Sequence, residues 1–138
     1  MVCIVLPSPN GSTISLATGD TPTYAGCLRN ATAVAKAAMR HGPRIGVIPC
    51  GERWADDATL RPALEDLIGA GAVIAELHGT RSPEATAAVW AFEGAAASLL
   101  ETIGACSSGK ELVERGQAVH TLRHSAPARP GCARHKRP

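Results

Sequence analysis

The sequence predicts an α/β fold, in which helices cover a layered sheet of mostly parallel strands. Three short apolar segments rich in β-branched residues are typical of strands, and segments with helical periodicity follow them. Strands that alternate with helices in this way favour a parallel sheet, because each connecting helix crosses over a face of the sheet. Three strands are few for this class, so we expect that an edge strand is missing or that a partner chain supplies it.

The first predicted strand covers residues 2–6, and the prolines that follow end it because proline has no N–H for a ladder bond. Asn10 and Gly11 then permit a tight turn, which leads into a short helix predicted over residues 11–18. A strand that runs into such a turn and a helix gathers free N–H groups, which suits a phosphate group; the simpler interpretation is a turn that only caps the helix. The second and third strands are predicted over residues 24–28 and 44–50.

Capping residues and apolar periodicity predict the later helices. Asn30 is a favourable N-cap, Ser82 followed by proline and an acid is a favourable helix start, and Ser108 begins a capping box. These helices are predicted over residues 31–40, 62–77, 83–104 and 109–116. Gly69 and Gly71 inside the second of them each cost about 1 kcal/mol relative to alanine, which indicates close packing against a neighbouring element.

The charged residues are unevenly distributed along the chain. Residues 1–117 hold all twelve acidic residues and nine of the fourteen Lys and Arg residues, whereas residues 118–138 hold five basic residues and no acid. The second segment is also rich in proline and lacks apolar periodicity. We therefore expect one α/β domain over residues 1–117 and a disordered, basic, Pro-rich tail over residues 118–138. No nucleic-acid partner is expected, because the tail lacks interleaved aromatic residues.

The remaining composition argues against membrane insertion and against a zinc site. No run of about 18 apolar residues and no signal-peptide pattern is present, so we expect a cytoplasmic protein without a membrane partner. The five cysteines are an odd number and form no C-x-x-C pair, so a zinc site is not expected. They are expected to act as small apolar side chains.

Three polar loops are predicted to meet where the strands end, because the carboxyl ends of parallel strands lie along one edge of a sheet. The candidate substrate-binding residues in these loops are Asn10, Gly11, Ser12, Arg29, Asn30, Glu52 and Arg53. Arg29 and Arg53 carry guanidinium groups that bind a doubly charged oxyanion in bidentate fashion, although each alone also suits a surface ion pair. No Ser–His pair at a nucleophile elbow is present, so the sequence indicates no catalytic nucleophile or base.

Glu65 and Asp66 are the candidate metal ligands, in the first turns of the predicted helix over residues 62–77. Adjacent helix residues point about 100° apart, so only one of the two faces a given metal ion squarely, together with Glu52 or Asp56. The alternative is that both are solvated acids that stabilise a helix N-terminus. Oxygen ligands, arginines and free N–H groups together favour phosphate-ester hydrolysis with Mg²⁺ over acyl transfer.

Five segments resemble the 2-phosphosulfolactate phosphatase family, in the family's order and with its approximate spacing. They are VLPSPNGS at residues 5–12, CLRNA at 27–31, GERW at 51–54, LRPALEDLIGAGA at 60–72 and CSSGKEL at 106–112. The resemblance covers roughly residues 2–117, and the long fourth segment makes it specific.

The resemblance implies a three-layer α/β/α fold and a Mg²⁺-dependent enzyme that hydrolyses 2-phospho-3-sulfolactate, or a similar small phosphate monoester, to 3-sulfolactate and phosphate. This reaction is a step toward coenzyme M, and its substrate is a small anionic phosphate. Family members are nearly twice as long and begin with an Asp-x-Leu-Arg-Ala motif that this chain lacks. We therefore expect a truncated or partial member with an incomplete sheet, whose exposed edge favours a homo-oligomer. The alternative is a non-catalytic α/β remnant that binds anions or a partner chain.

Overall fold

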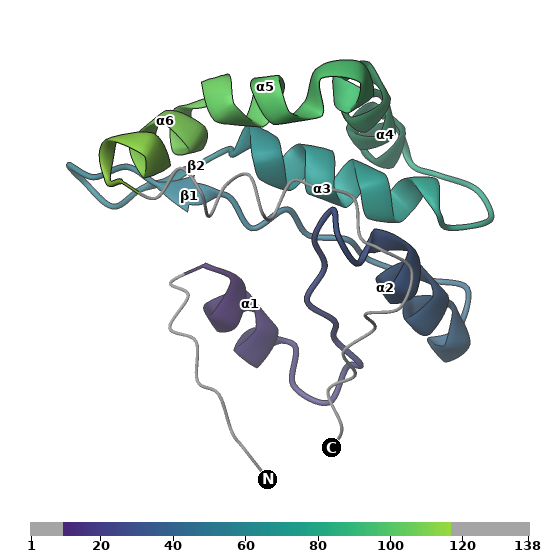
Figure 1. The fold of residues 1–138 in the computed structure, drawn as a ribbon. Coiled ribbons are helices and arrows are strands. Elements are labelled where there is room, and N and C mark those ends of the chain that lie inside the picture. Colours follow the sequence, from purple (N-terminus) through teal and green to yellow (C-terminus); the bar gives the residue numbers. More distant parts are fainter. Residues whose placement is uncertain (1–9, 117–138) are drawn as a thin grey trace, which may run out of the picture.

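The computed structural model describes residues 10–116, which fold mainly into helices around a central helix, α3 (Figure 1). The α-helices are α1 (Gly11–Ala17), α2 (Ala31–Ala38), α3 (Leu64–Ala75), α4 (Pro83–Ala95), α5 (Leu99–Ala105) and α6 (Ser107–Glu114). Two 3-10 turns, η1 (Met39–His41) and η2 (Ala96–Ser98), follow α2 and α4, and the strands are β1 (Glu52–Arg53) and β2 (Leu60–Arg61). In Figure 1, α4, α5 and α6 run along one side of α3, whereas α2 lies on the other side.

The core forms where α3 packs against α4 and α2, and α3 and α4 share the largest contact between elements in the described part. A Cβ atom at Gly71 would overlap the carbonyl oxygen of Ala88, so this glycine allows the two helix backbones to approach closely. Gly69 has open space around it, so the predicted close packing is confirmed at Gly71 and is wrong at Gly69. The buried hydrophobic residues on these three helices are Ala31, Ala35, Ile68, Ala70, Ala72, Val73, Ile74, Ala88, Val89 and Ala95.

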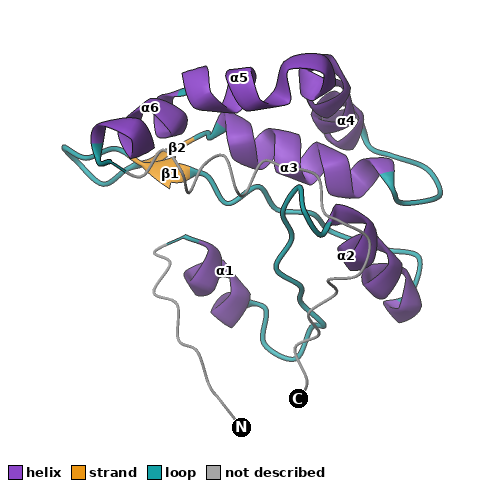
Figure 2. Cartoon of the chain, viewed as in Figure 1, coloured by secondary structure: helices purple, strands orange, loops and turns teal. Residues whose placement is uncertain are grey.

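The sheet differs from the prediction. β1 and β2 form an antiparallel pair in which Glu52 lies opposite Arg61, and within residues 10–116 this pair is the only sheet (Figure 2). Residues 24–28 and 44–50 have strand-like composition but form no ladder, so the two strands predicted there are wrong for this structure. Apolar, β-branched composition favours a strand only where a second strand supplies hydrogen bonds, and no described segment does so. The fold is therefore a helix-rich α/β arrangement, and the strand predicted over residues 2–6 lies outside the described residues.

The helix starts follow local chemistry, with two corrections. Ser82 caps α4 as predicted, because its Oγ accepts the Ala85 N–H at 3.2 Å and Pro83 is the first helical residue. The helix predicted over residues 83–104 is interrupted by η2, which divides it into α4 and α5. The helix predicted from Pro62 begins instead at Leu64 (α3), with the residue before it in extended geometry.

The N-terminus of α6 departs from the predicted capping box. Cys106 precedes the helix, and its Sγ accepts the Gly109 N–H at 3.4 Å. Ser108 lies within the first turn and is buried, so it does not act as the cap. Asn30 precedes α2 as predicted but makes no cap bond; its side chain instead accepts the Cys27 N–H at 2.7 Å and donates to the Ala25 carbonyl.

No helix in residues 10–116 combines the length and the apolar character needed to cross a bilayer. The basic segment predicted as a tail, residues 118–138, lies outside the described residues.

Candidate active site

The structure brings Asn10, Glu52 and Asp66 together from three separate segments. The Asn10 amide Nδ2 donates to the Gly51 carbonyl at 2.9 Å and to Glu52 Oε2 at 3.3 Å. The Gly51 N–H donates to Asp66 Oδ2 at 2.7 Å, which ties the first turn of α3 to the start of β1. We call Asn10, Glu52 and Asp66 the acidic cluster. Asn10 precedes the other two by more than 40 residues in the sequence, yet all three belong to one hydrogen-bonded group.

Negative charge is concentrated at this cluster. Partial burial raises the pKa of the Asp66 carboxyl, and the charges of Glu65 and Glu52 raise it further, against a lowering by the Gly51 N–H. The carboxylates of Glu52, Glu65 and Asp66 therefore repel one another, and a cation bound among them would relieve that repulsion. Among residues 10–116, the buried Asn10 Oδ1 makes no hydrogen bond, which leaves one further oxygen available as a ligand.

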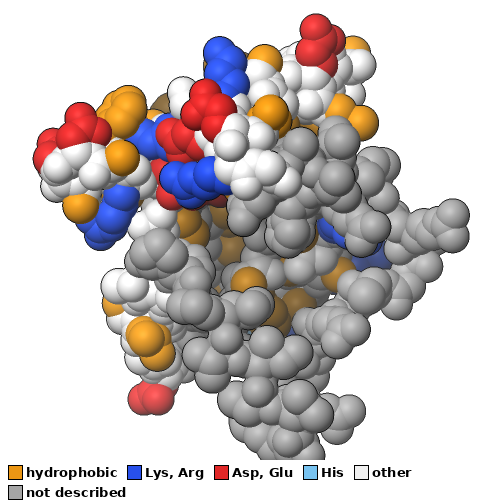
Figure 3. Space-filling model, turned by 60° about the vertical axis from the view of Figure 1, so that its left-hand side comes forward, with side chains coloured by type: hydrophobic (Ala, Val, Ile, Leu, Met, Phe, Trp, Pro, Cys, Tyr) orange, Lys and Arg blue, Asp and Glu red, His pale blue; other side chains and the backbone are white. Residues whose placement is uncertain are grey.

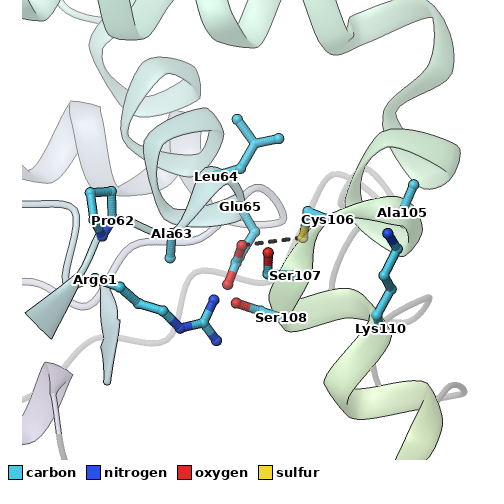
Figure 4. A pocket seen from close by; sticks show the side chains of 10 residues that line it. All are labelled: Arg61, Pro62, Ala63, Leu64, Glu65, Ala105, Cys106, Ser107, Ser108 and Lys110. Atoms are coloured by element: carbon cyan, nitrogen blue, oxygen red, sulfur yellow. Dashed lines mark hydrogen bonds between the residues drawn. The ribbon is translucent and has the colours of Figure 1, made fainter. Parts of the chain in front are cut away.

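A polar pocket adjoins the acidic cluster between the start of α3 and the junction of α5 with α6. It has a volume of about 250 Å³. Its lining residues are Arg61, Pro62, Ala63, Leu64, Glu65, Ala105, Cys106, Ser107, Ser108 and Lys110 (Figure 4). We call it the Arg61 pocket. Two lining residues are direct neighbours of the acidic cluster: Arg61 lies opposite Glu52 in the β1–β2 pair, and Glu65 precedes Asp66 in α3.

Arg61 is the central cation of this pocket and is only 4% exposed. Its Nη2 donates to Glu111 Oε1 at 2.7 Å, and its Cζ atom lies 5.2 Å from the centre of the Trp54 ring. In the described part of the chain its Nε–H has no acceptor, and the Ser108 hydroxyl, also buried, has no partner. Figure 4 shows the Arg61 guanidinium and the Ser108 hydroxyl directed toward each other across the pocket, with the Glu65 carboxylate between them.

Cys106 forms the opposite wall of the pocket. Its Sγ lies 3.4 Å from Glu65 Oε2 and 3.0 Å from the Ile103 carbonyl oxygen, so the thiol proton is donated to one of these two acceptors. Burial raises the pKa of the Cys106 thiol, and the nearby Glu65 charge raises it further. Cys106 is therefore a neutral thiol at neutral pH and a poor nucleophile. Its contacts instead favour a role in positioning the Glu65 carboxylate and the N-terminus of α6.

The structure brings some of the predicted site residues together and places others in separate loops. Asn10, Glu52 and Asp66 meet, Glu65 lies beside them, and Gly11 and Ser12 begin α1 directly after Asn10. Arg53 is exposed, and its Nη1 donates to the Ala58 carbonyl at 2.6 Å, within the loop that joins β1 to β2. Arg29 and Asn30 lie in the turn before α2, where the contacts of the Asn30 side chain are with Cys27 and Ala25.

Five residues of the site are not among those predicted from the sequence: Arg61, Cys106, Ser108, Lys110 and Glu111. They lie in two of the segments that carry the family resemblance, residues 60–72 and 106–112, so a signal was present in the sequence. Pairing the two segments required the structure, because Arg61 and Glu111 are 50 positions apart.

Protein side chains alone do not complete a metal site in the described region. Within residues 10–116, no group of three or more His, Cys, Asp or Glu side chains is arranged to hold a metal ion. Mg²⁺ commonly binds through one or two carboxylates and completes its shell with water and substrate phosphate oxygens. The oxygens of Glu52, Asp66 and Asn10 fit that pattern.

Comparison with known proteins identifies a family. The family model described as 2-phosphosulpholactate phosphatase matches residues 3–121 of the chain. No curated protein and no solved structure gives a significant match.

Proposed function

Because the chain belongs to the 2-phosphosulpholactate phosphatase family, whose members hydrolyse phosphoric monoesters, we propose that it is a Mg²⁺-dependent phosphatase acting on 2-phospho-3-sulfolactate or a similar small phosphate monoester. The products are 3-sulfolactate, or the corresponding alcohol, and phosphate. The observation that carries the proposal is the acidic cluster, in which carboxylates from β1 and α3 and the amide of Asn10 are held together beside a polar pocket.

Three residues of this chain would hold Mg²⁺: Asp66, Glu52 and Asn10 through its unpartnered Oδ1. Bound there, Mg²⁺ supplies neutralisation of phosphoryl charge and activation of a water molecule. Glu65, the other predicted ligand, contacts the Cys106 thiol instead, so we assign it to the pocket wall. Hard oxygen donors of this kind suit Mg²⁺ better than they suit zinc.

The chain's own groups orient the site. The Gly51 N–H holds the Asp66 carboxylate in place, and the Asn10 side chain joins the start of α1 to the start of β1. Gly11 and Ser12 would then offer backbone N–H groups to the phosphoryl oxygens, while Arg29 and Arg53 would bind the remaining negative charge of the substrate. Arg53 has to leave the Ala58 carbonyl to do so, which its exposure permits.

We also propose that the chain forms the three-layer α/β/α arrangement with a mostly parallel sheet when strand partners are available. Residues 24–28 and 44–50 keep the apolar, β-branched pattern of strands and would pair once neighbouring strands are present. Those strands would come from a second copy of the chain, since an unpaired edge recruits strands.

The test is phosphate release from 2-phospho-3-sulfolactate and from an aryl phosphate by the full chain. We expect release with Mg²⁺ that EDTA abolishes, and loss of at least tenfold in rate for Asp66→Asn. The matched control is Asp20→Asn, at an exposed position, which should leave the rate unchanged. No release above blank from folded protein would contradict the proposal. Calorimetric binding of phosphate without turnover would instead favour a non-catalytic, anion-binding remnant.

A further inference from the structure

We propose that the Arg61 pocket is a binding site for a tetrahedral oxyanion, held by the Nε–H of Arg61 and the hydroxyl of Ser108. The inference deepens the proposed function, on which it rests for the identity of the substrate. The oxyanion is either the phosphoryl group of that substrate or its sulfonate group. Both present the same arrangement of oxygen acceptors to the pocket.

Two buried polar groups of the pocket lack hydrogen-bond partners. Arg61 is 4% exposed and Ser108 is 8% exposed, and neither the Arg61 Nε–H nor the Ser108 hydroxyl has a partner among residues 10–116. Burying a polar group without a hydrogen bond is costly, so native proteins leave few such groups. Because both residues line one cavity of about 250 Å³, a ligand bound there can supply the missing hydrogen-bond partner.

Positively charged and N–H groups around the cavity also favour an anion. Lys110 lines the pocket from α6, and the first-turn N–H groups of this eight-residue helix add positive potential. Glu65 opposes an anion, but its Oε2 lies 3.4 Å from the Cys106 Sγ, and within residues 10–116 its carboxylate makes no ion pair with Arg61 and no hydrogen bond with Ser108. The oxyanion would therefore bind on the Arg61 and Ser108 side of the cavity.

The pocket also has the size and position of a site for part of a small substrate. A volume of about 250 Å³ lies just below the usual range of about 300–1,000 Å³ for ligand pockets, so the pocket fits a small molecule. Arg61 of its lining lies opposite Glu52 of the acidic cluster in the β1–β2 pair. Acidic and basic side chains gather together on the corresponding face of the molecule (Figure 3). One substrate with two anionic groups can thus place one group at the metal ligands and the other in the pocket.

The experiment titrates the full chain at low salt, with EDTA present so that metal-bound phosphate does not contribute. The probes are inorganic phosphate and methanesulfonate, followed by calorimetry. Ser108→Ala should weaken binding about three- to tenfold without lowering the melting temperature, because it removes one hydrogen bond and a buried hydroxyl that has no partner. Lys110→Gln should weaken binding and reduce its salt dependence. Tighter binding of methanesulfonate than of phosphate would assign the pocket to the sulfonate end of the substrate, and the reverse would assign it to the phosphoryl end.

Matched control variants are Ser98→Ala and Lys36→Gln, which alter exposed residues outside the pocket and should bind like the wild type. The inference is overturned if neither probe binds, or if the pocket variants bind as tightly as these controls. Turnover with an unchanged KM in Ser108→Ala and Lys110→Gln would overturn the inference while leaving the phosphatase proposal intact. Binding that depends on Ser108 without any turnover would support the inference and count against the phosphatase proposal.

Discussion

The guanidinium of Arg61 donates to the carboxylate of Glu111 at 2.7 Å, joining β2 to α6 across 50 residues of sequence. Arg61 is buried, whereas the Glu111 side chain is 43% exposed, so the pair lies at the boundary between the pocket and solvent. This contact holds the two segments of the Arg61 pocket in register. Without it, a buried cation would have no carboxylate partner among residues 10–116.

Glu111→Gln is therefore expected to lower the free energy of unfolding by about 1–3 kcal/mol, toward the lower value because solvent screens the exposed carboxylate. Urea denaturation measures the change. The control is Glu114→Gln on the same helix, at an exposed position, which should change stability by less than about 0.5 kcal/mol. Equal effects of the two substitutions would show that the ion pair does not stabilise the fold.

The contrast between Gly71 and Gly69 gives a second prediction within one helix. Gly71→Ala should destabilise the protein by about 1–3 kcal/mol or more, since the new Cβ overlaps the Ala88 carbonyl and forces α3 and α4 apart. Gly69→Ala should stabilise it by roughly 0.5–1 kcal/mol, because alanine is the better helix former and the site is open. Thermal unfolding of both variants measures the pair. A shift of the melting temperature in the same direction for both substitutions would contradict close packing at Gly71 alone.

Asp66 makes the stability of the fold depend on pH. Its pKa is raised in the folded state, so its contribution to stability is fully present below the unfolded pKa of about 3.9 and is lost as the pH rises through the folded value. We expect the free energy of unfolding of the wild type to fall, relative to that of Asp66→Asn, as the pH rises above about 4. Urea titrations across this range test the slope. Parallel curves for the two proteins would contradict the prediction.

Asp66 should also make the stability of the protein depend on Mg²⁺. Addition of millimolar Mg²⁺ at neutral pH should raise the melting temperature of the wild type, because a bound cation stabilises the folded state and relieves the repulsion among Glu52, Glu65 and Asp66. Asp66→Asn should show a smaller rise or none. An equal rise in both proteins would place the ion elsewhere.

The reactivity of the Cys106 thiol tests its burial in the pocket wall. Because burial and the Glu65 charge raise the pKa of its thiol, it should react with iodoacetamide more slowly than a free model thiol at pH 8. Mass spectrometry of the labelled peptide follows this cysteine separately from the others. Glu65→Gln removes the charge while keeping an acceptor, and should speed the reaction. A rate equal to that of the model thiol would contradict the described burial of the Sγ atom.

Local interactions made several features predictable from the sequence. Ser82 followed by Pro83 determines where α4 begins, and the region of α3 follows from apolar periodicity, because both depend on residues close in the chain. The family, too, was accessible, since segments such as residues 60–72 keep their order and spacing whatever contacts they make.

The tertiary structure alone decided which segments meet. Asn10 reaches Gly51, Asp66 reaches the same residue, and Arg61 reaches Glu111, each across a separation that no capping or periodicity rule spans. The strands predicted over residues 24–28 and 44–50 failed for the same reason, because a strand depends on a ladder partner that its own composition does not specify. Sequence thus determined the helices and the chemistry that each segment carries, whereas long-range packing of α3 against α4 and of β2 against α6 determined where that chemistry converges.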